Sequence, residues 1–427
     1  RRSGGLPLYR KTTLENGLRV ISTTLPHVRS LSLTVVVGAG SRHESLDRSG
    51  LAHFVEHMLF KGTERRPTAK EIAEAIEGVG GVFNAETDKE TTTYWVKVAA
   101  AHWPVALDIV SDVLRRSRFA PDELERERRV IIEELHMVAD TPGELVNVLI
   151  DEVLWEGHPL GRDVAGTPET VARLTRDDLL AFVRTFYTPG NLIVAVAGPL
   201  DHAQIVQDIA VALGDWPPGD PPGWQPFEGA QPGPRVRLIY RKTEQAHFCL
   251  GFPGLAYTHP QRYALGLLNI ILGEAMSSRL FLELRERRGL AYEVHSSVHH
   301  YRDTGALVIY AGVDPRRIEE AIQVVREQTL ALRAGPDPAE LARAKEYLKG
   351  RLLLSLEDTR NLALWLGGQE LRYGRVLSVE EVLAQIDRQS PDDLRAVAEA
   401  VLRPERQNLA VVGPFRGSER FQRLLLA

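Results

Sequence analysis

The stretch of residues 214–234 divides this chain more clearly than any other feature of its sequence. It opens with Gly-Asp-Trp-Pro-Pro-Gly-Asp-Pro-Pro-Gly-Trp and contains further glycine and proline. This composition cannot support a regular helix or strand, so it predicts an extended linker between two folded parts. The length of 427 residues points the same way, because it exceeds what one hydrophobic core usually organises.

The sequence after this linker repeats a pattern found before it. Residues 408–414 (Asn-Leu-Ala-Val-Val-Gly-Pro) resemble residues 191–199 (Asn-Leu-Ile-Val-Ala-Val-Ala-Gly-Pro), and an Asp-Asp-Leu triplet precedes each at nearly the same distance. Such self-similarity indicates an internal duplication. We therefore expect an α+β fold of two duplicated α/β sandwich half-domains, 1–213 and 235–427, each with an antiparallel-rich sheet and helices packed on it.

The first half contains the motif His-x-x-Glu-His at residues 53–57. Apolar residues recur around it with the period of an amphipathic helix, which we expect over residues 49–60. At that period His53 and His57 lie one turn apart on one face, with Glu56 on the same side. Two imidazoles suit zinc, and a catalytic zinc site leaves one position for water. The alternative is a charged, solvated helix face that contains two histidines.

A zinc site needs a third protein ligand, and a long charged helix offers several candidates. The helix expected over residues 122–139 contains Glu123, Glu125, Glu127, Glu133 and Glu134. Glu127 and Glu134 share one face with Val130 and Ile131, a partly apolar stripe on which an ionised carboxylate is costly without a partner. We therefore predict Glu134 as the ligand, with Glu127 one shell further out. Glu133, about 100° round the helix, is the alternative.

Composition limits the remaining classes of function. The formal net charge of −5 argues against nucleic-acid binding. The single cysteine, Cys249, excludes an intrachain disulfide and leaves a zinc–thiolate site with almost no ligands. No run of eighteen apolar residues occurs, so no membrane span is expected. A cytoplasmic location is the default expectation, and a start at Arg1 without methionine is compatible with a trimmed N-terminus.

Taken together, these residues resemble the pitrilysin/insulinase family of inverzincin metallopeptidases, most closely the short bacterial relatives of the mitochondrial processing peptidase β subunit. The resemblance runs along essentially the whole chain and is most specific at residues 50–63, 83–85 and 125–134. It implies Glu134 as the third zinc ligand and Glu127 as the family's additional glutamate. Both assignments agree with the helix-face argument.

A second signature occupies residues 277–292. The resemblance implies that Arg285 and Tyr292, seven residues apart, reach the scissile peptide, where their donors can stabilise a developing oxyanion. The alternative is a helix-surface arginine and a tyrosine that packs on the following strand. The glycine-rich loop of the family's α subunits has only the short segment 272–276 in its place, so a presequence-guiding loop is not expected.

The resemblance also implies a mechanism and a substrate. One Zn²⁺ per chain is expected, although manganese or cobalt could occupy the same ligands. Glu56 is expected to accept a proton from the attacking water and to pass it to the leaving amine. Phe83, Asn84 and Ala85 look like the edge strand that receives the substrate as an added β-strand. For Asn84 the alternative is a simple strand-end turn residue.

The expected assembly is a homodimer. The family's chamber needs four half-domains and this chain supplies two, so Arg285 and Tyr292 of one subunit are expected to face the zinc of the other. The expected substrates are unfolded peptides or extended segments. Two alternatives stay open: a non-catalytic structural homologue, and a catalytic subunit that is active only in a heterodimer with a separate partner chain. A zinc scaffold without a reaction is disfavoured, because it would not need Glu56.

Overall fold

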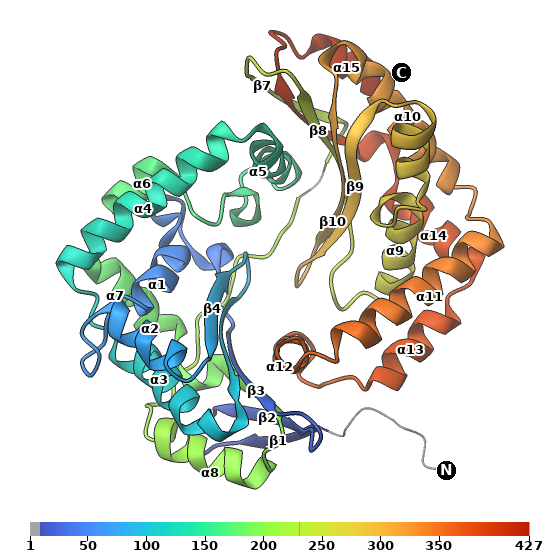
Figure 1. The fold of residues 1–427 in the computed structure, drawn as a ribbon. Helices are drawn as coiled ribbons and strands as arrows, with labels where there is room; N and C mark the ends of the chain where they lie inside the picture. Colours follow the sequence, from blue (N-terminus) through green and yellow to red (C-terminus); the bar gives the residue numbers. More distant parts are fainter. Residues whose placement is uncertain (1–8, 230, 427) are drawn as a thin grey trace, which may run out of the picture. The chain divides into compact units, whose positions relative to one another are not determined.

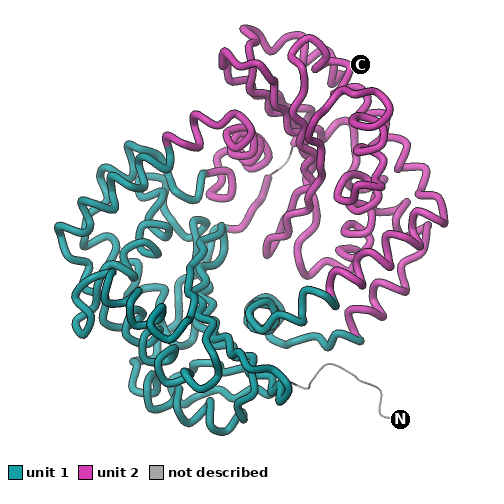
Figure 2. Tube along the Cα trace, in the orientation of Figure 1, with its two compact units in different colours: residues 1–135, 163–225, 353–380 teal, residues 136–162, 226–352, 381–427 magenta. Residues whose placement is uncertain are grey.

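The computed structural model describes residues 9–229 and 231–426, which form two compact α+β units (Figures 1 and 2). Unit 1 comprises residues 1–135, 163–225 and 353–380. Unit 2 comprises residues 136–162, 226–352 and 381–427. Each unit thus combines most of one half of the sequence with a segment from the other half.

Unit 1 is built on a six-stranded sheet in the order β1-β2-β6-β3-β5-β4. The strands are β1 Tyr9–Thr13, β2 Arg19–Thr24, β3 Ser30–Val37, β4 Val82–Thr87, β5 Thr92–Ala99 and β6 Leu192–Gly198. β2 and β6 pair in parallel, and every other neighbouring pair is antiparallel. The central strand β3 is buried along almost its whole length, as expected for a strand covered on both faces.

The helices of unit 1 have buried apolar faces, and several begin at a capping residue. They are α1 Leu51–Leu59, α2 Ala69–Glu77, α3 Trp103–Arg116, α4 Pro121–Asp140, α6 Pro168–Arg173, α7 Arg176–Phe186, α8 His202–Leu213 and α12 Thr359–Tyr373, with α4 continuing into unit 2. α12 comes from the second half of the sequence and packs on β3 and β6 (Figure 1). The buried Glu370 carboxylate joins this helix to Lys11 at 2.6 Å, so α12 is part of unit 1.

Unit 2 is built on a five-stranded sheet in the order β7-β11-β8-β10-β9. Its strands are β7 Arg235–Tyr240, β8 Ala246–Pro253, β9 Ala291–His300, β10 Gly305–Val313 and β11 Asn408–Gly413. Its helices are α5 Pro142–Leu154, α9 Arg262–Asn269, α10 Ile318–Leu332, α11 Pro338–Ser355, α13 Val379–Arg388, α14 Pro391–Val401 and α15 Glu419–Leu426, with π-helical segments η6 Ile270–Glu274 and η7 Phe281–Arg287. α5, from the first half of the sequence, packs on β8 and β11.

The described chain also contains short 3-10 helices. They are η1 Ser41–His43, η2 Leu46–Arg48, η3 Ala100–His102, η4 Pro159–Gly161, η5 Pro189–Asn191, η8 Pro315–Arg317 and η9 Pro404–Arg406. Between α8 and β7, the described residues of the glycine- and proline-rich stretch form neither helix nor strand. No described helix is long and apolar enough to cross a membrane.

The predicted duplication is confirmed by the topology of the two sheets. β6 lies between a parallel neighbour, β2, and an antiparallel neighbour, β3, and β11 lies in the same way between β7 and β8. The helices that precede them, α7 and α14, both begin with a capping box, formed by Thr175 with Asp178 and by Ser390 with Asp393. The residues 267–272, which stand where the first half has its histidine motif, are buried in α9 and η6.

Gly50, at the start of α1, offers a test of this local structure. Its φ is +93°, and an added Cβ would lie 2.4 Å from the Ala165 carbonyl oxygen. We expect Gly50→Ala to destabilise the protein by about 1–3 kcal/mol and to lower the thermal unfolding midpoint. The control is Gly368→Ala in α12, where the nearest atom would be 3.9 Å away. That change should be neutral or stabilise by about 0.5–1 kcal/mol. Equal midpoints for the two variants would contradict this account of Gly50.

Candidate metal centre

The helix α1 is held at its N-terminus by a buried carboxylate. Glu44 accepts hydrogen bonds from the backbone N–H groups of Gly50, at 2.9 Å, and Ala52, at 2.6 Å. A carboxylate in this position satisfies free amide groups and complements the positive end of the helix dipole. The apolar face of α1 is buried as predicted, which leaves His53, Glu56 and His57 half-buried on the other side.

The two imidazoles of the motif turn the same nitrogen toward one point. Nε2 of His53 and Nε2 of His57 are 3.2 Å apart, and the ring centroids are 4.5 Å apart. Two nitrogen ligands of a tetrahedral zinc ion, each about 2.0–2.1 Å from the metal, lie roughly 3.3–3.4 Å apart. The spacing of the two histidines therefore fits zinc.

The third donor comes from α4. Oε2 of Glu134 is 3.9 Å from Nε2 of His53 and 3.8 Å from Nε2 of His57. Within residues 9–229 and 231–426, these three side chains form the one group of His, Cys, Asp or Glu arranged to hold a metal ion. Glu133 is exposed, lies outside this group and makes the weaker candidate.

The face of α4 differs in one respect from the sequence analysis. Val130 is 49% exposed, so the expected apolar stripe through this residue is wrong. The buried positions are Leu124, Glu127, Ile131 and Leu135, and Glu134 lies at the margin of this face. Glu134 can therefore reach the histidines while it remains partly open to solvent.

Glu127, the predicted outer-shell group, lies behind His57 and contacts its other ring nitrogen. Its Oε2 is 3.0 Å from Nδ1 of His57, and its Oε1 is 2.8 Å from Nζ of Lys61. Burial raises the pKa of Glu127, but the hydrogen bonds from His57 and Lys61 outweigh burial and leave that pKa below its usual range. The carboxylate thus holds a proton on Nδ1 of His57 and leaves Nε2 free to bind a metal.

The remaining groups have pKa values that suit a metal-dependent site. Burial, together with the nearby His57, lowers the pKa of His53 to about 4, so this ring is neutral at pH 7. Neutral imidazole is the form that binds metal. Burial raises the pKa of Glu56, and the hydrogen bond that Thr87 donates to its Oε2 only partly opposes this shift. A carboxyl group with a raised pKa is better suited to accept and return a proton near neutral pH.

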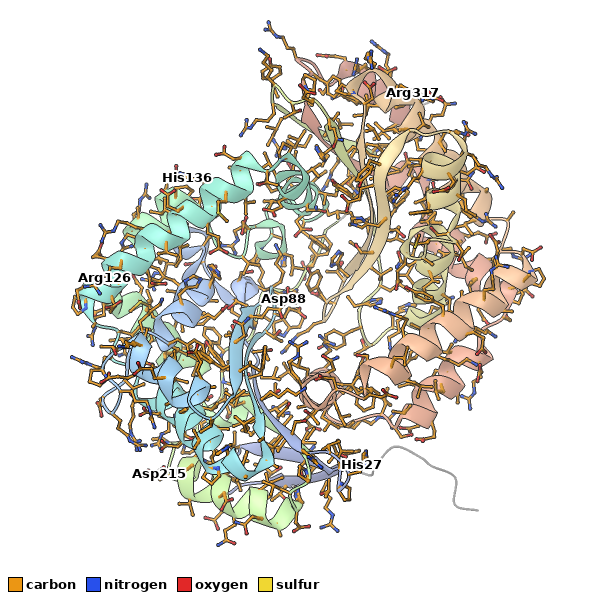
Figure 3. All side chains as sticks on the ribbon, in the orientation of Figure 1. His27, Asp88, Arg126, His136, Asp215 and Arg317 are labelled. Carbon is orange, nitrogen blue, oxygen red and sulfur yellow. The ribbon has the colours of Figure 1, made fainter. Side chains whose placement is uncertain are left out.

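The predicted strand at residues 83–85 is the edge strand β4, which has β5 as its one neighbour among the described strands. Asn84 is exposed within this strand, and its Oδ1 accepts a hydrogen bond from the N–H of Ala85. Phe83 is half-buried, with its ring 5.1 Å from that of Phe60. Asp88, labelled in Figure 3, follows the end of β4, and Arg126 and His136 mark α4.

The second predicted pair, Arg285 and Tyr292, lies together in unit 2. The Arg285 guanidinium is 5.4 Å from the ring centroid of Tyr292 and 5.0 Å from that of Phe281. Ala291 pairs with Val313 but Glu293 pairs with Gly312, so Tyr292 is the extra residue of a β-bulge. Bulges re-aim side chains, and Tyr292 is 78% exposed.

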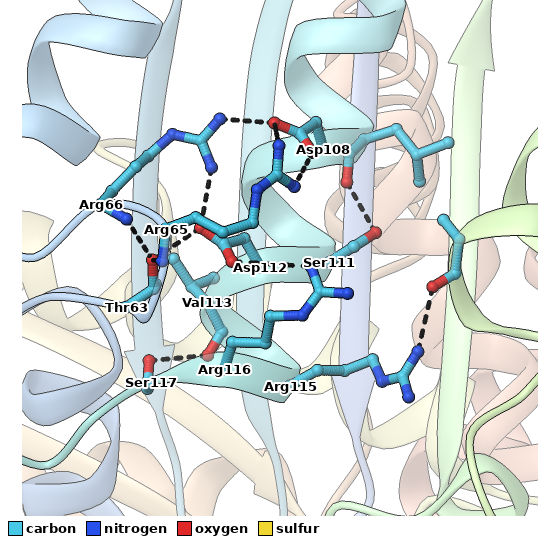
Figure 4. A network of polar contacts seen from close by, with 12 residues as sticks. Thr63, Arg65, Arg66, Asp108, Ser111, Asp112, Val113, Arg115, Arg116 and Ser117 are labelled. Atoms are coloured by element: carbon cyan, nitrogen blue, oxygen red, sulfur yellow. Dashed lines mark hydrogen bonds and ion pairs between the residues drawn. The ribbon is translucent and has the colours of Figure 1, made fainter.

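Sequence reasoning missed three residues that position this site: Glu44, Lys61 and Thr87. Lys61 lies four residues after the motif, and this proximity was its only signal. The turn that carries it is tied to α3, because Thr63 Oγ1 and Arg66 Nη1 each donate to Oδ2 of the buried Asp112 at 2.7 Å (Figure 4). Nothing in the sequence marked Glu44 or Thr87, whose partners are met only in the folded chain.

Metal content separates the two candidate glutamates. We expect purified Glu134→Gln protein to lose bound zinc, because an amide oxygen is a neutral and weaker zinc ligand than a carboxylate. Glu133→Gln should retain the zinc of the wild-type protein. Elemental analysis after dialysis against a weak chelator measures both. The assignment fails if Glu133→Gln loses the metal and Glu134→Gln keeps it.

Comparisons with known proteins place this site in a family. The family model described as Insulinase (Peptidase family M16) matches residues 19–168, and the model described as Peptidase M16 inactive domain matches residues 173–348. All the candidate metal ligands lie within the first match.

Relatives match along almost the whole chain. An uncharacterized zinc protease of Streptomyces coelicolor is 40% identical over 97% of this chain and 92% of its own length. An uncharacterized zinc protease of Bacillus subtilis is 36% identical over 95% of this chain and 98% of its own length.

The fold is shared with two solved structures. A protease from Helicobacter pylori has a TM-score of 0.90 at 24% identity, covering 95% of this chain and 100% of its own. A peptidase M16 inactive domain from Pseudomonas fluorescens has a TM-score of 0.89 at 21% identity, covering 96% of this chain and 98% of its own. The chain therefore belongs to peptidase family M16, the pitrilysin/insulinase family of zinc proteases.

Proposed function

We propose that this protein is a zinc metalloendopeptidase that hydrolyses unfolded peptides or extended segments. The observation that carries the proposal is the convergence of His53, His57 and Glu134 beside the half-buried Glu56. A structural zinc site is closed by four protein ligands, whereas this group supplies three and adds a carboxylate next to them. That arrangement is typical of hydrolysis.

Each residue has a defined part in the proposed reaction. One zinc ion would be held by His53, His57 and Glu134. When bound, it would act as a Lewis acid, lowering the pKa of water and polarising a peptide carbonyl. Thr87 donates to Oε2 of Glu56 and thereby orients the carboxylate. Oε1 of Glu56 then accepts a proton from water, and the raised pKa lets Glu56 hold this proton and return it to the leaving amine.

The edge strand β4 supports recognition of an extended peptide backbone. One side of β4 pairs with β5, and no described strand pairs with the other side, so a substrate strand can be added there. Thr87, at the end of this strand, is hydrogen-bonded to Glu56, so the strand and the proposed base are physically joined. Phe83, Asn84 and Ala85 would contact the substrate mainly through their backbone, which favours broad sequence preference.

The proposed active form is a homodimer, as the resemblance to the family implies. Arg285 and Tyr292 lie together and Tyr292 is exposed, so both can donate to a substrate carbonyl. We assign them to the active site of the partner subunit, because the family resemblance calls for four half-domains and this chain supplies two. A symmetric dimer would then contain two composite sites.

The first test is cleavage of a quenched fluorescent peptide by the purified protein, with and without a chelator. We expect Glu56→Gln to lower the rate by roughly 10²–10⁴-fold, the usual contribution of a general base, while zinc content is unchanged. Glu133→Gln is the matched control and should remain active. Cleavage that survives Glu56→Gln would place the chemistry on another residue.

The same assay addresses the two alternatives. No cleavage by zinc-loaded wild-type protein would favour a non-catalytic homologue. Activity that appears only after addition of a second, different chain would favour a heterodimeric enzyme. Either result would overturn the homodimeric peptidase proposed above.

Mixing two inactive variants tests whether the active sites are shared between subunits. Glu56→Gln and Arg285→Gln subunits should each be nearly inactive alone. After exchange at equal concentration, one site of each mixed dimer has both residues intact, so about a quarter of wild-type activity should return. Activity that stays at the level of the parents in a confirmed mixed dimer would mean that Glu56 and Arg285 act within one chain or not together.

A further inference from the structure

Unit 2 contains an open hollow of about 490 Å³ beside α15. Arg416, Arg420 and Arg423 line it, together with Phe415 and Glu419. This volume lies within the usual range of ligand sites in proteins. The wall of the hollow is therefore chiefly cationic.

Two of the three guanidinium groups of this hollow have no ionic partner among the described residues, whereas Arg420 stacks on the rings of Phe415 and Phe421. Arg416 lies 5.9 Å from the Tyr240 ring centroid, and neither Arg416 nor Arg423 makes a side-chain hydrogen bond or ion pair within residues 9–229 and 231–426. Nε of Arg420 is buried without a hydrogen bond, although Oε1 of Glu319 is 3.4 Å away. Guanidinium groups bind carboxylates in pairs of parallel hydrogen bonds, so this hollow is suited to a carboxylate-rich ligand.

Charge is concentrated around the hollow. Segments 235–245 and 414–426 together contain seven Arg or Lys residues and two Glu residues, in a chain with a net charge of −5. These segments are neighbours in the fold, because β7 pairs with β11 and also contacts α15 (Figure 1). A basic surface on an acidic protein attracts an anionic partner.

The outer edge of β7 indicates that this partner is a peptide. The N–H groups of Arg235 and Arg241 donate inward, to Gln407 and Gly413. Because a strand alternates, the backbone groups of Val236, Leu238 and Tyr240 face outward. No described strand pairs with them. An unpaired edge recognises the backbone of an extended peptide, which neither a nucleic acid nor a lipid headgroup provides.

We propose that the outer edge of β7 and the arginines beside α15 form a docking site for an extended acidic peptide segment. The segment would add to β7 as a strand and place its Asp or Glu carboxylates against Arg416, Arg420 and Arg423. This site is distinct from the pair Arg285 and Tyr292, because that pair belongs to η7 and β9, and β9 is the opposite edge of the same sheet. It would hold a substrate or partner by a region that is not cleaved.

Binding is measured by fluorescence anisotropy with the full chain carrying Glu56→Gln, so that peptide is not consumed. The probes are a labelled peptide with Glu at alternate positions and the same peptide with Gln at those positions. We expect the Glu peptide to bind at least about tenfold more tightly, as the loss of charge-assisted hydrogen bonds implies. The double variant Arg416→Gln/Arg423→Gln should remove this difference, and methylation of alternate peptide backbone amides should also weaken binding.

The matched control is Arg351→Gln, an exposed arginine on α11 of the same unit, which should bind as the parent does. Equal binding of the Glu and Gln peptides, or unchanged binding by the double variant, would overturn the proposal. Tighter binding of an oligonucleotide or of vesicles with anionic lipid, lost in the same variant, would overturn the assignment to a peptide. If the double variant melts at a lower temperature than its parent, Arg423→Gln alone replaces it, with a smaller expected loss.

Discussion

The hydrogen bond between His57 and Glu127 is the contact on which the candidate site depends. It joins α1 to α4 across seventy positions of sequence and fixes which nitrogen of His57 is free. A buried carboxylate is costly alone, but Lys61 and His57 satisfy both of its oxygens. Once the two helices are held in this way, Glu134, two turns further along α4, is brought to the same point as His53 and His57. The metal-binding geometry is therefore a consequence of how one helix is packed against another.

In each unit, one face of the sheet is covered by a helix from the other half of the sequence. A sheet with two apolar faces needs a cover on each side. In unit 1 the helix α12 from the second half of the sequence packs on β3 and β6, and in unit 2 the helix α5 from the first half packs on β8 and β11. Each half of the duplicated chain therefore contributes one helix to the core of the other half. One boundary between the compact units, at residues 225/226, falls within the linker at residues 214–234, and the exchanged segments account for the others.

The duplication also relates the two ends of the proposed chemistry. β4 and β9 occupy the same edge position in their respective sheets. In the first copy this edge continues to Thr87, which is hydrogen-bonded to Glu56. In the second copy the edge starts with the bulge at Tyr292, beside Arg285. The equivalent edge strand thus reaches the proposed base at its end in one unit and carries the proposed oxyanion donor near its start in the other. The histidine motif is absent from the second unit.

Much of this protein was determined by local patterns in its sequence. Apolar periodicity predicted α1 and placed His53, Glu56 and His57 on its other face, and the repeat around Asn191 and Asn408 predicted two similar sheets. These signals are readable because helix and strand periods depend on neighbouring residues alone. The tertiary structure decided the rest: Val130 is exposed, Glu44 caps α1, Thr87 contacts Glu56, and α5 and α12 cover sheets of the other half. Glu44 caps residues only six and eight positions away, whereas the other features depend on contacts between residues far apart in the chain. A single sequence carries no periodic signal for any of them.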